Sequence, residues 1–210
     1  MIPVAFGLLF GPAGAWGMAI GNMLGDIFGG SFALGSIFGL VGNFLLAYIP
    51  YKLWANIGVL KKEESLPDLK GVKKIIMFMV IAILANAACS MFIAWGVDLL
   101  GIAPFSIIGT TIFINNTIAS CTLGFVLTIL LFPRIKKWNL YWMDVMTEED
   151  LPKGGVLAKV GAYITSILVI ICFPLGLVFA YSIGGIQVPI VMVIAGIGSI
   201  GCLVGGILMN

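Results

Sequence analysis

The chain has 210 residues, of which 61% are hydrophobic and 10% are charged, and its mean hydropathy is +1.17. A soluble domain of this length needs a more polar exterior, so the composition excludes an ordinary soluble protein. Its 11 basic residues stand against 9 acidic ones, and they do not form the basic aromatic surface that a nucleic-acid partner requires.

Apolar segments recur along the whole chain, separated by short polar stretches. Each approaches or exceeds the ~20 residues that a helix needs to cross the hydrocarbon core of a bilayer. The sequence therefore predicts an all-α, polytopic transmembrane bundle of about six helices, which forms one domain over residues 1–210. In chain order the segments are 2–24, 31–54, 75–97, 105–132, 160–181 and 188–209.

The first segment can be interpreted in two ways because Gly11-Pro12 interrupts it. It can be one kinked helix that runs outward from a cytoplasmic N-terminus. It can also be two short helices that turn at Gly11-Pro12, which would put Met1 outside. Because residues 1–10 are too few to span a bilayer alone, we favour the kinked helix and expect both termini on the cytoplasmic side.

Basic residues are confined to alternate loops. All of them are Lys52 or lie within residues 55–74 and 133–159, and the other loops have none. The positive-inside rule then places both charged loops in the cytoplasm and predicts a multi-pass protein of the cell membrane. Trp138, Tyr141 and Trp142 follow the second basic cluster, as expected for anchors at the membrane interface.

Small residues form a row on the first segment, at Ala13, Gly17, Gly21 and Gly25. A neighbouring row contains Gly11, Ala15 and Ala19. Such faces lack bulk, so another helix backbone can approach them closely. The row Ala13/Gly17/Gly21/Gly25 can serve packing inside the bundle or docking of a separate membrane subunit, and the sequence leaves both alternatives open.

Polar side chains also occur within the apolar segments, where exposure to lipid is costly. They can form hydrogen bonds between helices, or they can line a ligand pocket that opens outward. Asp98, at the outer end of the third segment, is expected to be a solvated loop acid. The candidates for a pocket are Asn22, Asp26, Asn86, Asn115 and Asn116.

Several kinds of chemistry have no sequence signature here. The chain contains no His, its four cysteines lie singly in apolar runs, and no HExxH or GxSxG motif occurs. We therefore expect no metal, no cofactor and no enzymatic activity. No GxxxxGK[ST] loop occurs either, so the chain is not expected to hydrolyse ATP itself.

One family resemblance emerges from the first half of the chain. Residues 2–30 read IPVAFGLLFGPAGAWGMAIGNMLGDIFGG, and residues 36–54 read SIFGLVGNFLLAYIPYKLW. Through Phe10-Gly11-Pro12, the small-residue row and Gly25-Asp26, these stretches resemble the substrate-binding S components of energy-coupling factor (ECF) transporters. The Asn-containing fourth segment with its basic end at 133–137 is similar to the closing helix of that family, so the resemblance covers about residues 2–137.

The resemblance implies a helical bundle that captures a vitamin or another micronutrient outside a prokaryotic cell. It also implies docking, through small residues, onto a transmembrane coupling subunit that two ATP-binding subunits drive. Two features depart from the family pattern: a helix normally precedes the Phe10-Gly11-Pro12 stretch, and the helical pair in 160–209 is additional. The alternative is a structural or assembly subunit of a larger membrane complex, without a ligand of its own.

Overall fold

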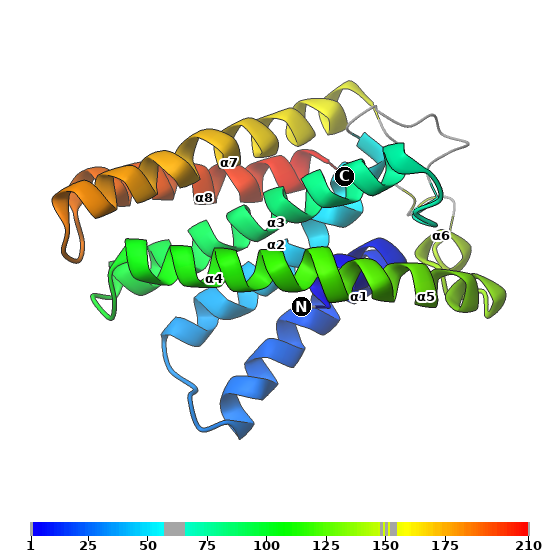
Figure 1. The fold of residues 1–210 in the computed structure, drawn as a ribbon, viewed down its shortest axis with the longest axis horizontal. Helices are drawn as coiled ribbons and strands as arrows, with labels where there is room; N and C mark the ends of the chain where they lie inside the picture. The colour runs from blue at the N-terminus through cyan, green and yellow to red at the C-terminus, as the bar shows by residue number, and fades with distance from the viewer. Residues whose placement is uncertain (1, 57–65, 148, 150, 152–154, 210) are drawn as a thin grey trace.

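The computed structural model describes residues 2–56, 66–147, 149, 151 and 155–209, and within these ranges every regular element is a helix (Figure 1). This confirms the predicted all-α class. The elements are α1 (Pro3–Phe28), α2 (Gly35–Asn56), α3 (Val72–Leu99), α4 (Phe105–Ala119), the π-helix η2 (Ser120–Gly124), α5 (Phe125–Lys137), α6 (Trp142–Val145), α7 (Val156–Ile183) and α8 (Pro189–Leu208).

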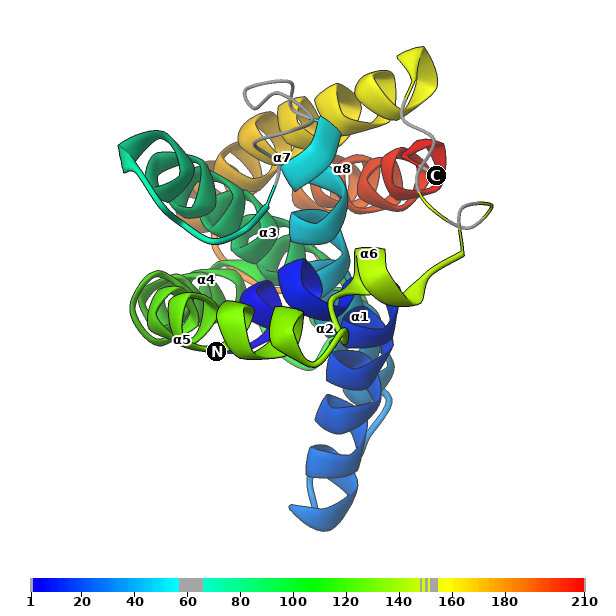
Figure 2. The ribbon, with the colours of Figure 1, turned by 90° about the vertical axis from the view of Figure 1, so that its right-hand side faces the viewer.

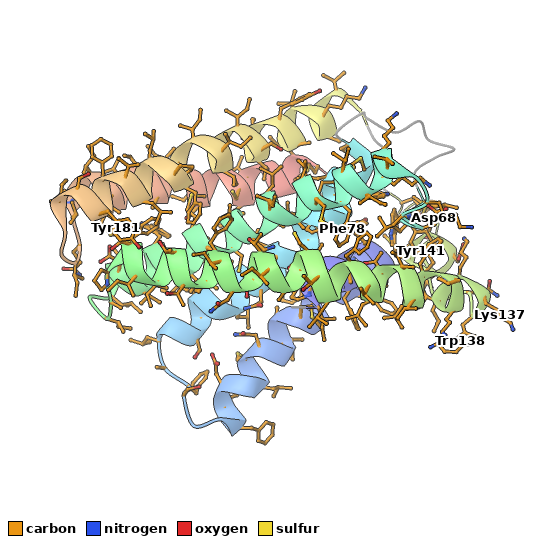
Figure 3. The ribbon with its side chains drawn as sticks, viewed as in Figure 1. Asp68, Phe78, Lys137, Trp138, Tyr141 and Tyr181 are labelled. Atoms are coloured by element: carbon orange, nitrogen blue, oxygen red, sulfur yellow. The ribbon has the colours of Figure 1, made fainter. Side chains whose placement is uncertain are left out.

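Six helices in the described ranges are long and apolar enough to cross a membrane, as predicted. Helices α4 and α5, joined by η2, form one continuous span. Charged side chains gather at one end of the bundle, where Figure 3 shows Asp68 and Lys137, while Tyr181 lies at the opposite end. The second turn of α7 packs against the last turn of α8, so α8 ends at the charged end, which the positive-inside rule assigns to the cytoplasm. Lys61, Lys62 and Lys153 lie outside the described residues.

Helix α3 lies at the centre and packs against α2, α4, α7 and α8. Its buried residues form one apolar core together with side chains of α1, α2, α4, α7 and α8. Glycines bring the helices close together: a methyl group on Gly96 would overlap the Phe38 ring, and one on Gly201 would overlap the Leu168 side chain. The small residues of α8 therefore serve packing within the chain.

The first arm of α1, residues 3–10, runs toward the charged end of the bundle. The backbone at Gly7 lies against Ala47 of α2. Gly11, one turn after Gly7, lies against Tyr51, which is one turn after Ala47 on α2. The contact positions thus rise together along both helices, as they do when two helices are parallel. Helix α2 runs inward, so this arm runs inward too.

The second arm, residues 12–28, runs in the opposite direction. The centroid of the Trp16 ring lies 4.9 Å from that of Phe44, and Asn22 faces Gly39. Residue numbers along α2 therefore decrease as those along α1 increase, so the two helices are antiparallel here. The chain therefore reverses within α1, and Figure 1 shows that α1 begins beside the middle of the α4–α5 span. The reversal agrees with the interpretation with two short helices, but that interpretation places the start of the chain outside, whereas α1 begins beside the middle of a span. The favoured single helix running outward from the cytoplasmic side is not observed.

The reversal depends on Gly11 and Pro12. Gly11 has φ 57° and ψ −131°, a conformation that glycine adopts far more readily than other residues. Pro12 has no N–H, so the Leu8 carbonyl loses the donor that a helix would supply. The buried Trp142 of α6 replaces that donor, because its Nε1 donates to Leu8 O at 3.1 Å. Trp142 is thus a buried brace of the turn, and its predicted role as an exposed interface anchor is wrong.

We predict that Trp142→Phe destabilises the protein, because the Leu8 carbonyl would then be buried without a donor, at a cost of about 1–3 kcal/mol. Thermal unfolding in detergent, followed with a thiol-reactive dye that reports exposure of the buried cysteines, measures the effect. Trp138→Phe is the matched control, because Trp138 is 63% exposed. Equal melting temperatures for the two variants would contradict the proposed brace.

Candidate solute site and docking face

Three polar side chains meet where the outward arm of α1 crosses α2. Asn22 and Asp26 are one helical turn apart, and both face Gly39: a Cβ on Gly39 would lie 3.0 Å from Asn22 Nδ2 and 4.0 Å from Asp26 Oδ2. Asn43 Nδ2 donates to the Gly39 carbonyl at 2.9 Å. Sequence reasoning did not select Asn43, although its position one turn after Gly39 was a usable signal.

Asn86 of α3 is fully buried, and only one of the two polar atoms of its side-chain amide has a hydrogen-bond partner among the described residues. Its Nδ2 donates to Ala82 O in the same helix at 2.8 Å, while its Oδ1 has no partner among the described residues. The Thr117 and Ser120 hydroxyls are also buried without partners in the part of the chain that the structure describes. Unpaired buried acceptors are costly, so these atoms are available to a ligand or to water.

The register between α3 and the α4–α5 span places these unpaired groups at one depth. Ala94 lies beside Gly109, and Phe78 lies beside Phe125, with ring centroids 5.8 Å apart. Along the sequence, Thr117 is midway between Gly109 and Phe125. Asn86 is likewise midway between Phe78 and Ala94 on α3. The amide therefore lies opposite Thr117 in the antiparallel pair, directly before η2. Single-turn π-helices often occur at functional sites.

Asn115 and Asn116 lie on α4, the first exposed and the second half-buried. As neighbours in a helix they point about 100° apart, so they do not face the same partner. Neither side chain forms a hydrogen bond to another described residue. Hydrogen bonds between helices were one of the two roles that the sequence allowed for these residues. Such bonds are not observed for Asn115 or Asn116 within the described ranges.

The five candidate residues form separate groups. Helix α1 makes its main contacts with α2, whereas α4 packs on α3 and α7. Asn22 and Asp26 therefore lie together, Asn86 lies in the core, and Asn115 and Asn116 lie on α4. Within the described residues, no three side chains of the metal-binding types come together.

The two rows of small residues on α1 have different surroundings. Gly11, Ala15 and Ala19 are buried, so this row serves packing inside the bundle. The other row is exposed, and a Cβ on any of its three glycines would meet no atom within 4 Å. Figure 2 shows why, since the second arm of α1 extends away from the helices other than α2. The exposed members are Ala13, Gly17, Gly21 and Gly25.

Asp98, expected to be a solvated loop acid, is instead 1% exposed. Its Oδ1 accepts a hydrogen bond from Gln187 N at 2.7 Å, and Gln187 Nε2 donates to Leu99 O at 2.9 Å. Gly184, Gly185 and Gln187 all have positive φ, so this outer turn is tightly bent. The acid thus joins the turn between α7 and α8 to the end of α3, and the expectation of solvent exposure is wrong.

Comparison with protein families supports the resemblance seen in the sequence. Residues 3–133 match the family described as QueT transporter. The chain belongs to the QueT transporter family. QueT proteins are S components of ECF transporters, so the recognised resemblance is confirmed. No curated protein and no solved structure is significantly similar to the chain.

Membership of the QueT transporter family establishes the broad function. The chain is a multi-pass membrane protein and a substrate-binding S component for micronutrient uptake, and the family implies a transporter rather than an enzyme. The match extends from α1 through most of α5. It therefore includes all the candidate solute residues and the whole exposed row, and it ends before α6, α7 and α8.

We predict that Asp98→Ala loosens the outer turn, because the Gln187 N–H loses its acceptor. Hydrogen–deuterium exchange of the detergent-purified protein should show faster exchange across residues 184–188. Asp144→Ala is the control, since Asp144 pairs with Lys136 at the opposite end and should leave this turn unchanged. Identical exchange in the Asp98→Ala and wild-type proteins would show that the contact does not hold the turn.

Proposed function

We propose that this QueT family member captures a queuosine precursor at the outer face and delivers it through a separate coupling subunit driven by ATP-binding subunits. The solute follows from the family, whose S components serve queuosine precursors. The observation that carries the proposal is the outward arm of α1. One face of this arm presents polar side chains that have no partner among the described residues, and another face presents the exposed glycine row. The two faces are about 100° apart.

The polar residues suit a guanine-related base, the chemical class of the proposed solute. Such a base presents N–H donors beside a carbonyl acceptor on one edge. A carboxylate accepts two N–H donors, and an amide both donates and accepts. We assign Asp26 to the donors and Asn22 to the carbonyl. Asn115 and Asn116 of α4 and Asn86 of α3 would join them only after the outward arm moves toward α4, because the five residues form separate groups in this structure.

Transport needs no chemistry on the solute under this proposal. The exposed row of α1 would let a coupling-subunit helix approach closely, and this dry contact would stabilise the complex through packing. ATP binding and hydrolysis would occur on the partner subunits. Their work would be transmitted as reorientation of the bundle.

We predict that Asp26→Asn weakens binding of a queuosine precursor about 10- to 100-fold, the loss expected when a charged hydrogen-bond partner becomes neutral. Isothermal titration of the purified protein measures the dissociation constant. Asp144→Asn, at the cytoplasmic end, is the matched control and should bind as the wild type does. An unchanged constant for Asp26→Asn argues against the assigned site, and absence of binding to the wild type argues against the solute.

We predict that the double variant Gly17→Leu/Gly21→Leu folds normally but no longer copurifies with the coupling subunit from native membranes. Both positions have open space in the chain, so bulk there should leave thermal stability unchanged and block only an incoming helix. Thr111→Leu places the same side chain on an exposed position of α4 and should retain the partner. Copurification of the double variant at the wild-type level would exclude this row as the docking face.

A structural or assembly subunit without a ligand is the second candidate. The observation in its favour is that the polar candidates do not converge on one cavity among the described residues. A structural or assembly subunit would need the exposed row of small residues for its contacts, but it would not need the polar side chains. Retained assembly in the Asp26→Asn and Asn115→Ala variants, together with no solute binding by the wild type, would favour this alternative.

A further inference from the structure

A cavity of about 650 Å³ opens at the cytoplasmic end, away from the candidate solute residues. It lies between residues 66–70, which precede α3, and the second half of α5. Its lining combines an apolar floor with a charged rim. The floor contains Leu66, Leu69, Ile129, Phe132 and Pro133, and the rim contains Asp68, Lys70, Lys136 and Lys137.

The acid on the rim is already neutralised. Asp68 Oδ1 lies 2.7 Å from Lys74 Nζ and also accepts a hydrogen bond from Lys70 N at 3.2 Å. Partial burial pushes the Asp68 pKa upward, but these hydrogen bonds and the nearby cations hold it below its usual value. The carboxylate therefore stays charged at neutral pH, and its charge balances that of Lys74.

The remaining rim charges are an excess of cations. Lys136 Nζ pairs with Asp144 Oδ1 at 2.5 Å. Lys70 and Lys137 are both exposed, and neither forms an ion pair within the described residues, although the charge of Lys70 also acts on Asp68. Within the described residues, four lysines at this mouth outnumber the two acids Asp68 and Asp144 by two, and this excess favours a ligand with negative charge. The lysines are Lys70, Lys74, Lys136 and Lys137.

The cavity reaches from the membrane surface into the hydrocarbon region. Ile129 and Lys137 are eight residues apart on α5, which corresponds to about 12 Å along the helix axis. Ile129 is 40% exposed, so the deep end of the cavity is open to lipid. Trp138, beside the cationic end and 63% exposed, has the position of an interface anchor (Figure 3).

We propose that this cavity is a binding site for an anionic phospholipid of the cytoplasmic leaflet. The headgroup phosphate lies between Lys70 and Lys137, and an acyl chain follows Ile129 and Phe132. An inorganic phosphate would use the cations but leave the apolar floor empty, and a zwitterionic lipid would gain less from the excess charge. Basic pockets on the cytoplasmic side of transmembrane helices suit this class of ligand. The site does not depend on the identity of the transported solute.

The test is native mass spectrometry of the purified chain, titrated with dioleoyl phosphatidylglycerol or dioleoyl phosphatidylcholine. We expect the wild type to prefer the anionic lipid about 10- to 30-fold, the effect of two lysines near the surface. Lys70→Gln/Lys137→Gln should abolish this preference, whereas Lys70→Arg/Lys137→Arg should retain it. Lys159→Gln, which removes an exposed cation of α7 at the same end, should have no effect.

Three results would overturn the proposal. The first is an unchanged lipid preference in the double glutamine variant. The second is displacement of phosphatidylglycerol by millimolar inorganic phosphate, which would assign the cations to a soluble anion. The third is loss of a protein partner from native membranes with unchanged lipid binding, which would make the cavity a protein interface. Because the arginine variant keeps both charges, it separates loss of the site from loss of the fold.

Discussion

The Leu8 carbonyl is the backbone group on which the arrangement of α1 depends. It is buried inside the protein, away from water, and Pro12 removes its helical donor. The indole of Trp142 supplies the missing hydrogen bond from α6, after the chain has completed three further spans, α2, α3 and α4–α5. The reversal at Gly11 is thus braced by a residue far along the sequence. It directs residues 12–28 outward beside α2, away from α3, α7 and α8, and this direction leaves the glycine row uncovered.

Close helix approach has two uses in this chain, and the neighbours of each glycine distinguish them. A methyl group on Gly201 or Gly205 of α8 would overlap side chains of α7, so these positions hold the C-terminal pair together. At the outer end, Asp98 joins the turn of that pair to α3, while the Tyr181 hydroxyl contacts Thr110 and donates to Ser106 O. The pair lies outside the family match, yet it covers the central helix. The glycines of the outward arm of α1 have no such neighbour and remain open to a partner.

Local sequence patterns predicted the parts of the structure that local physics determines. Hydropathy over about 20 residues located the spans, and the confinement of lysine and arginine to alternate loops gave their orientation. The direction of the chain before Pro12 could not be predicted, because it depends on the positive φ of Gly11 and on a distant indole. The burial of Asp98 depends on the backbone of Gln187, and the unpaired Oδ1 of Asn86 depends on the register of α3 with α4. In each of these cases a partner from a distant segment of the chain helps to decide the outcome.

The outward arm of α1 also suggests how solute capture and docking are linked under the proposed function. Its polar pair and its glycine row lie on adjacent faces of one short helix, so neither face can change its orientation without the other. A solute held between Asp26 and α4 would restrict the angle of the arm at the Gly11 turn. The same restriction would fix the position of the glycine row before the coupling subunit arrives, which lowers the entropic cost of docking. By linkage, docking would then strengthen solute binding by the same factor.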